Sequence, residues 1–158
     1  MVYATLHRHS IDFERIDCDE AITMEDCVLV DEALHVSTVK TLFLCNRQQT
    51  NFYLFITTAN KPFVTKDFSA ALGISRVSFA TPELLKNMLG TVVGAATIFG
   101  VLLDLENRVQ VVIDKEVEAE EFYGCTDGTT TGYMKLRTRW ILKDFLAHAR
   151  HMPKIIQL

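Results

Sequence analysis

The chain lacks the features that are typical of zinc-binding, secreted or membrane-spanning proteins. Its four cysteines include no closely spaced pair, so neither a Cys-x-x-Cys zinc site nor a thioredoxin-like redox motif is expected. The N-terminal residues contain no continuous apolar core of the kind that a secretory signal needs. The longest mostly uncharged run, residues 89–103, is too short to cross a bilayer and is interrupted by glycine. We therefore expect a cytoplasmic protein with no bound metal and no membrane partner.

Linkers, internal repeats and low-complexity segments are also lacking, which favours one domain over residues 1–158. A chain of 158 residues buries roughly 68–70% of its unfolded surface, so it folds without a disulfide or a structural metal. The composition, 49% hydrophobic and 23% charged, is ordinary for a globular domain.

Positive charge is scarce except near the C-terminus. Residues 135–158 hold six cations and one anion, a net charge of +5, which leaves −9 on residues 1–134 out of the total of −4. An acidic body with a basic end indicates a polyanionic partner.

Local patterns predict interspersed helices and strands. The clearest is Thr81-Pro82 through Gly90, in which threonine caps a helix, proline takes its first position and glycine ends it. Helices are expected over residues 1–9, 23–35, 65–73, 81–90 and 138–148. Strands are expected over residues 11–17, 38–46, 51–57, 97–103, 108–114, 130–136 and 154–158, with hairpin turns at 47–50 and 104–107. Because no regular strand–helix alternation appears, we predict an α+β (mixed α/β) fold whose mixed, mostly antiparallel sheet has helices packed around it.

Three segments in fixed order resemble a known family. Residues 39–44 read V-K-T-L-F-L, residues 89–100 read L-G-T-V-V-G-A-A-T-I-F-G, and residues 122–131 read F-Y-G-C-T-D-G-T-T-T. They are similar to the K-N-L-F-L, L-G-V-x-x-G-S-V-S-P-F-G and H-P-x-x-N-T-A-T motifs of the YbaK/ProX family of aminoacyl-tRNA deacylases. The tail H-M-P-K-I-I also resembles that family's G-H-x-P-x-I-V ending, with Arg150 in place of the glycine.

The resemblance implies hydrolysis of the ester that joins a wrong amino acid to tRNA, without a metal or organic cofactor. Its partner would be aminoacyl-tRNA and not DNA. The family's lysine falls on Lys40 and its glycine loop on Gly94, where backbone N–H groups would stabilise the oxyanion of the transition state. These two residues are the expected catalytic pair. The expected substrate-binding residues are Thr41, Phe43, Gly124, Asp127 and Thr129.

Departures from the family pattern leave a second interpretation open. Gly124 stands at the histidine position, Cys125 at a proline, Gly128 at the asparagine and Ile98 at the proline of the glycine loop. The alternative is a catalytically silent member that binds tRNA or an aminoacyl compound. Lys40 also has a simpler interpretation, as a lysine that protects a sheet edge from association. The threonines after Asp127 are equally compatible with an ordinary strand that follows a glycine turn.

Three cations lie on one stripe of the helix expected at 138–148. At about 100° per residue, Arg139, Lys143 and Arg150 align, with Trp140 beside them. This pattern predicts a tRNA-binding face with an aromatic side chain that packs on an end base. The alternative is a solvated helix face. A metal site at His148 and His151 is not expected, because the helix dipole already favours histidines near a helix C-terminus.

Overall fold

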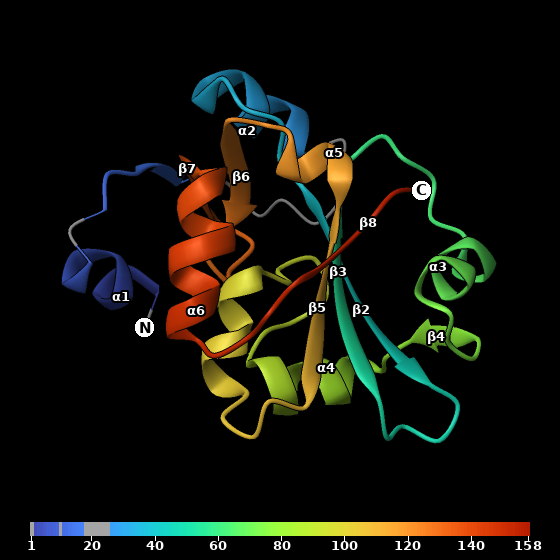
Figure 1. Cartoon of the computed structure of the whole chain (residues 1–158). Coiled ribbons are helices and arrows are strands. Elements are labelled where there is room, and N and C mark those ends of the chain that lie inside the picture. The colour runs from blue at the N-terminus through green and yellow to red at the C-terminus, as the bar shows by residue number, and fades with distance from the viewer. Residues whose placement is uncertain (1, 10, 18–25) are drawn as a thin grey trace.

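The computed structural model describes residues 2–9, 11–17 and 26–158, and its strands form two sheets (Figure 1). The larger sheet has the order β4-β2-β3-β5-β8, and the smaller sheet has the order β1-β7-β6. All pairs are antiparallel except β3–β5 and β5–β8, which confirms the predicted mixed, mostly antiparallel arrangement. The strands are β1 (Glu14–Asp17), β2 (Lys40–Asn46), β3 (Phe52–Thr57), β4 (Val77–Phe79), β5 (Val109–Asp114), β6 (Phe122–Thr126), β7 (Gly132–Arg137) and β8 (Lys154–Ile156).

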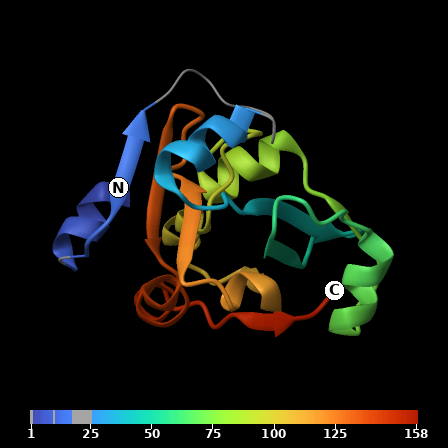
Figure 2. The same ribbon diagram turned by 90° about the horizontal axis from the view of Figure 1, so that it is seen from above.

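Helices cover both sheets. In Figures 1 and 2 α6 lies beside the smaller sheet, whereas α3 and β4 lie on the opposite side of the molecule. The helices are α1 (Val2–Arg8), α2 (Asp26–Leu34), α3 (Thr65–Leu72), α4 (Pro82–Leu89), a 3₁₀ helix (Ile98–Leu103), α5 (Lys115–Glu118), a π-helical turn (Trp140–Phe145) and α6 (Leu146–His148). Within the described ranges, none is long and apolar enough to cross a membrane.

Two apolar clusters lie on opposite faces of the larger sheet. The main cluster joins one face of β2, β3 and β5 to the smaller sheet, α4 and the last helix. Val109, Val111 and Ile113 all belong to it, which confirms the predicted alternation along β5. The second cluster lies under α3, where Leu44 and Phe55 meet Phe68. The central strand β3 is therefore buried on both faces.

Local helix signals were confirmed wherever a cap decided the boundary. The Thr81 hydroxyl accepts a hydrogen bond from the Leu84 N–H at 3.2 Å, and Gly90 ends α4 with φ of +68°. Helix α3 begins at Thr65 and is closed by Gly73 with φ of +65°, also as predicted. The predicted cap Thr23 lies outside the described residues, and α2 is described from Asp26 onward.

The strand predicted over residues 97–103 was wrong. This segment is the 3₁₀ helix that Thr97 caps, and it packs so tightly that a Cβ on Gly100 would lie 3.0 Å from Leu89 Cβ. A short apolar run that is buried all round does not distinguish a strand from a helix by its period. The predicted turn at 104–107 is present, because the Asn107 N–H donates to the Asp104 carbonyl at 3.1 Å, but it joins the 3₁₀ helix to β5 and not two paired strands. Strand β5 instead pairs in parallel with β3. Strands β4 and β6 were not predicted.

Candidate functional site

A cavity of about 440 Å³ opens where the two sheets meet. The chain before β2 joins the smaller sheet, because the Val39 N–H donates to the Gly124 carbonyl at 2.8 Å. At the other end of the opening, the Ala80 N–H donates to the Phe43 carbonyl at 2.9 Å. Among the described residues, no strand pairs with the edge of β2 between Val39 and Phe43. The N–H and C=O groups of Thr41 point to the same edge as those of Val39 and Phe43, so they face the cavity.

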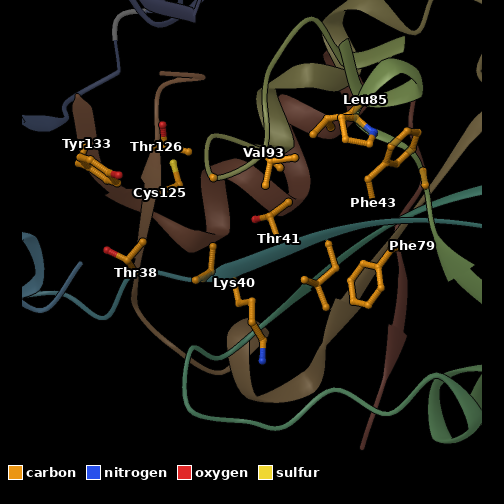
Figure 3. Close-up of a pocket in the computed structure, with 16 residues that line it drawn as sticks. Thr38, Lys40, Thr41, Phe43, Phe79, Leu85, Val93, Cys125, Thr126 and Tyr133 are labelled. Atoms are coloured by element: carbon orange, nitrogen blue, oxygen red, sulfur yellow. The ribbon is translucent and has the colours of Figure 1, made fainter. Parts of the chain in front are cut away.

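The cavity extends to both faces of β2, because neighbouring side chains on a strand point to opposite sides. Thr41 and Phe43 lie on the side of the main core, with Val93 and Gly94 across the opening. Lys40 points to the opposite side, as Figure 3 shows, and Phe79 shares that side because it pairs directly with Leu44. Lys40 and Gly94, the predicted catalytic pair, therefore line the same cavity from opposite sides of β2.

Lys40 is held by a network on its own side of the sheet. Its Nζ donates to the Lys61 carbonyl, and partial burial lowers the pKa of the Lys40 ammonium. The Lys61 ammonium lies 2.7 Å from the fully buried Asp114, which also accepts the Thr57 hydroxyl at 2.6 Å. Burial alone would raise the pKa of Asp114, but the hydrogen bonds from Lys61 and Thr57 outweigh it and the net pKa is lowered. This buried pair fixes the loop whose carbonyl holds Lys40.

Gly94 occupies a tight turn at the cavity rim. The Ala95 N–H donates to the Val92 carbonyl at 3.0 Å, and the Gly94 φ of +90° fits the third position of a type II turn. Thr91 braces the turn by donating its hydroxyl to the Ala95 and Gly128 carbonyls at 2.9 and 3.0 Å. The Gly94 N–H has no hydrogen-bond partner among the described residues, so it is available to a ligand. The positive φ favours glycine at this position.

Three predicted substrate-binding residues lie outside the cavity lining. A Cβ on Gly124 would point toward the segment before β2, 2.8 Å from Val36 Cγ1. Asp127 accepts hydrogen bonds from the Tyr3 hydroxyl at 2.7 Å and the Thr129 hydroxyl at 2.6 Å, which ties α1 to the β6–β7 turn. Thr129 is exposed within that turn. Thr41 and Phe43, in contrast, do line the cavity.

The sequence prediction missed several lining residues. Cys125, Thr126 and Tyr133 line the end formed by the smaller sheet, and Phe79 and Leu85 line the other end (Figure 3). Recognition of β6 as a strand would have placed Cys125 on the main core face. The Cys125 thiol is almost fully buried, and burial raises its pKa, so it remains protonated and forms a wall of the cavity.

The three cations of the predicted tRNA-binding stripe, Arg139, Lys143 and Arg150, are all exposed. A π-helical turn that spans Trp140–Phe145 changes the rotation per residue there, and Trp140 is only 8% exposed. Trp140 packs against His9 and Phe145, so the idea that it packs on an end base was wrong. Arg139 and Lys143 share a separate cavity with Glu118, Glu120 and Glu121.

Histidine side chains near the C-terminus have structural partners. His151 Nε2 lies 2.8 Å from Asp104 Oδ2 in the interior, and the His148 ring meets the His9 ring at 4.7 Å. No group of three metal-ligating side chains occurs within the part of the chain that the structure describes.

Comparisons with known proteins agree on one family. Residues 20–143 match the family model of the aminoacyl-tRNA editing domain. The chain is 30% identical over 116 residues to the prolyl-tRNA editing protein ProX of Acetoanaerobium sticklandii. The matched region covers 73% of this chain and 71% of that protein.

Solved structures show the same fold. One is a hypothetical protein, with a TM-score of 0.72, 14% identity and coverage of 98% of this chain and 97% of that chain. Another is a candidate trans-editing enzyme for prolyl-tRNA synthetase, with a TM-score of 0.68, 14% identity and coverage of 99% and 94%. The chain therefore belongs to the aminoacyl-tRNA editing domain family, in its YbaK/ProX group.

Proposed function

We propose that this chain is a trans-acting deacylase that hydrolyses the ester between a wrong amino acid and the 3′ end of a tRNA in the cytoplasm. The observation that carries the proposal is the cavity itself, in which Lys40 and the Gly94 turn flank an unpaired stretch of β2. Membership of the editing-domain family supports the substrate class. The chemistry then follows from what the lining offers.

Hydrolysis of an ester creates a negative oxygen, which needs fixed donors. The Gly94 N–H and the outward-facing Thr41 N–H are backbone donors on rigid elements, so they need no reorganisation during the reaction. Among the residues that the structure describes, the lining contains no carboxylate and no imidazole. Positioning and electrostatic stabilisation, rather than a side-chain general base, would therefore supply the rate enhancement.

Charge in the lining favours an anionic substrate with an uncharged amino acid. Lys40 is the single formally charged side chain among the described residues of the lining, and its ammonium can hold a phosphate or a carbonyl without planar geometry. The rest of the described lining is uncharged, with Cys125 and Tyr133 at the end formed by the smaller sheet and Leu85 at the other end. A charged amino acid side chain would lose its hydration there without a partner.

Hydrolysis of a panel of mischarged tRNAs tests the proposal. We expect Lys40→Ala to lower the rate about tenfold or more, which is about 1.4 kcal/mol of barrier. Lys66→Ala is the matched control, because Lys66 is exposed on α3 and lies outside the cavity lining. Wild-type activity in folded Lys40→Ala would remove the lysine from the mechanism.

The lack of an acid–base side chain also favours a second candidate, a silent member that binds aminoacyl-tRNA without hydrolysis. The same panel separates the two. Binding of mischarged tRNA with no hydrolysis for any amino acid would support the silent member and contradict the deacylase.

A further inference from the structure

Strand β4 presents an exposed aromatic ring at the cavity rim. Phe79 lines the cavity and is 58% exposed, which is unusual for so large an apolar side chain. Phe63 holds the ring from behind, with the two centroids 5.6 Å apart at 67°. The ring lies on the same side of the sheet as Lys40. A supported ring with a free surface, in a cavity whose one charge is positive, suits a nucleobase that is attached to phosphate.

Free cations continue along the same strand. Arg76 directly precedes β4, and Arg47 follows β2 at the hairpin turn beside it. Both line a hollow of about 500 Å³, and none of its six lining residues is acidic. Both are exposed and form no ion pair with any described residue. Arg76 lies three residue positions before Phe79, about 10 Å along the sheet. Alternation along β4 directs the two side chains toward opposite faces, so a nucleic-acid strand that contacts both must pass around the edge that β4 forms.

The cations of the last helix are less suited to a polyanion. Arg137, Arg139 and Lys143 line a cavity with three glutamates, which offset the positive charge, whereas no acidic residue lines the hollow of Arg47 and Arg76 among the described residues. The last helix also lies on the opposite side of the molecule from β4 (Figures 1 and 2). Phosphates that follow a base seated on Phe79 therefore meet Arg76 and Arg47 first.

We propose that Phe79, Arg76 and Arg47 form a track for the 3′ strand of tRNA, in which Phe79 stacks on the terminal base and the two arginines contact phosphates. This inference rests on the proposed function, because it assumes that the ester lies in the adjoining cavity. The track, and not the last helix, then accounts for most of the salt-dependent binding.

Stacking is tested with adenosine 5′-monophosphate and a tryptophan probe. The chain has one tryptophan, Trp140, and it is buried, so Phe79→Trp adds an exposed reporter on the ring position. We expect the nucleotide to quench the fluorescence of Phe79→Trp and to leave that of the wild type unchanged. Phe79→Ala should weaken the binding of deacylated tRNA about tenfold, whereas the exposed control Leu105→Ala should not. No quenching, with wild-type affinity in Phe79→Ala, would overturn the stacking role.

Two double variants with the same charge change test the arginines. Arg47→Gln with Arg76→Gln should reduce the salt slope of deacylated-tRNA binding by about 1.4, at about 0.7 for each phosphate contact to a single strand. Arg139→Gln with Lys143→Gln should leave the slope near that of the wild type. The reverse result would overturn the track and return the tRNA to the last helix, where the sequence alone predicted it.

Failure of the track and failure of the proposed function are distinguishable, because binding of deacylated tRNA needs no hydrolysis. If the protein hydrolyses mischarged tRNA but its affinity for tRNA is unchanged by substitution of Phe79, Arg76 and Arg47, the track alone is contradicted. Affinity that depends on these residues in a protein that hydrolyses no ester supports the track and contradicts the deacylase.

Discussion

Gly124 is the position where a structural role and a functional role make opposite predictions. A Cβ built there would lie 2.8 Å from Val36 Cγ1, 3.2 Å from the Ser37 carbonyl oxygen and 3.2 Å from Thr38 Cα. Two of these three atoms belong to the backbone and cannot move aside as a side chain can. Overpacking of this kind costs about 1–3 kcal/mol. We therefore expect Gly124→Ala to destabilise the protein by about 2 kcal/mol and to lower Tm by about 4–8 °C.

Thermal and denaturant unfolding measure this loss, and Val36→Ala provides the internal check. The double variant removes the closest of the three contacts, so its destabilisation should be smaller than the sum of the two single effects. Gly124→His, which introduces the residue of the family pattern, should be more destabilising still and should not increase hydrolysis. An unchanged Tm in Gly124→Ala would refute the packing argument and favour the interpretation that the missing side chain enlarges a substrate pocket.

Three further predictions follow from backbone strain and from buried charge. Gly94→Val should reduce hydrolysis about 100-fold but should lower stability by only about 1–2 kcal/mol. Gly73 also has a positive φ but lies outside the cavity lining, so the control Gly73→Val should lose stability and keep its activity. Normal turnover in Gly94→Val would show that Gly94 is only a turn residue. Arg150→Gly should stabilise the protein by about 1 kcal/mol, measured by chemical denaturation, because Arg150 has φ of +61° at the end of the last helix; a lower stability would contradict this. Asp104→Asn should cost about 2–3 kcal/mol near neutral pH, because the buried Asp104 carboxylate accepts hydrogen bonds from the Arg108 and Val109 N–H groups and lies 2.8 Å from His151 Nε2. Burial raises the pKa of the Asp104 carboxyl, but its hydrogen bonds together outweigh burial, so the net pKa is lowered. The ionised carboxylate therefore stabilises the fold above about pH 4, and this stabilisation is lost as pH falls through the lowered pKa. A difference in unfolding free energy between wild type and Asp104→Asn that persists in acid would refute this.

Much of the fold could be predicted because it depends on local chemistry. The cap at Thr81, the glycine at 90 and the alternation along β5 act over a few residues, and all three were confirmed. The error at 97–103 arose because the local signal there is ambiguous. Whether such a run forms a strand or a helix depends on its neighbours, here the close approach of Gly100 to Leu89. The resemblance to the family carried the rest of the fold prediction.

The site was less predictable because its geometry depends on contacts between distant segments. The bridge between Thr38 and Gly124 joins the two sheets, and no pattern in either segment specifies the other. That bridge explains why Gly124 contacts the chain before β2, whereas its neighbour Cys125 lines the cavity. A one-residue shift in a strand moves a side chain to the other face, so a motif alignment locates the site but not the side chains that enter it.

The same alternation determines how Lys40 can act. Lys40 and Thr41 are adjacent in sequence, yet they point to opposite faces of β2, and the Gly94 turn is on the face of Thr41. The Lys40 ammonium donates to the Lys61 carbonyl on the face of β2 opposite Thr41. From there it can hold a negative group at the edge of β2. The donors for an oxyanion lie across that edge. A substrate that satisfies both must cross the unpaired stretch of β2, with its amino acid on the core side and its nucleotide on the side of Lys40 and Phe79. In the deacylase that we propose, Lys40 would place the ester, and the backbone around Thr41 and Gly94 would stabilise its transition state.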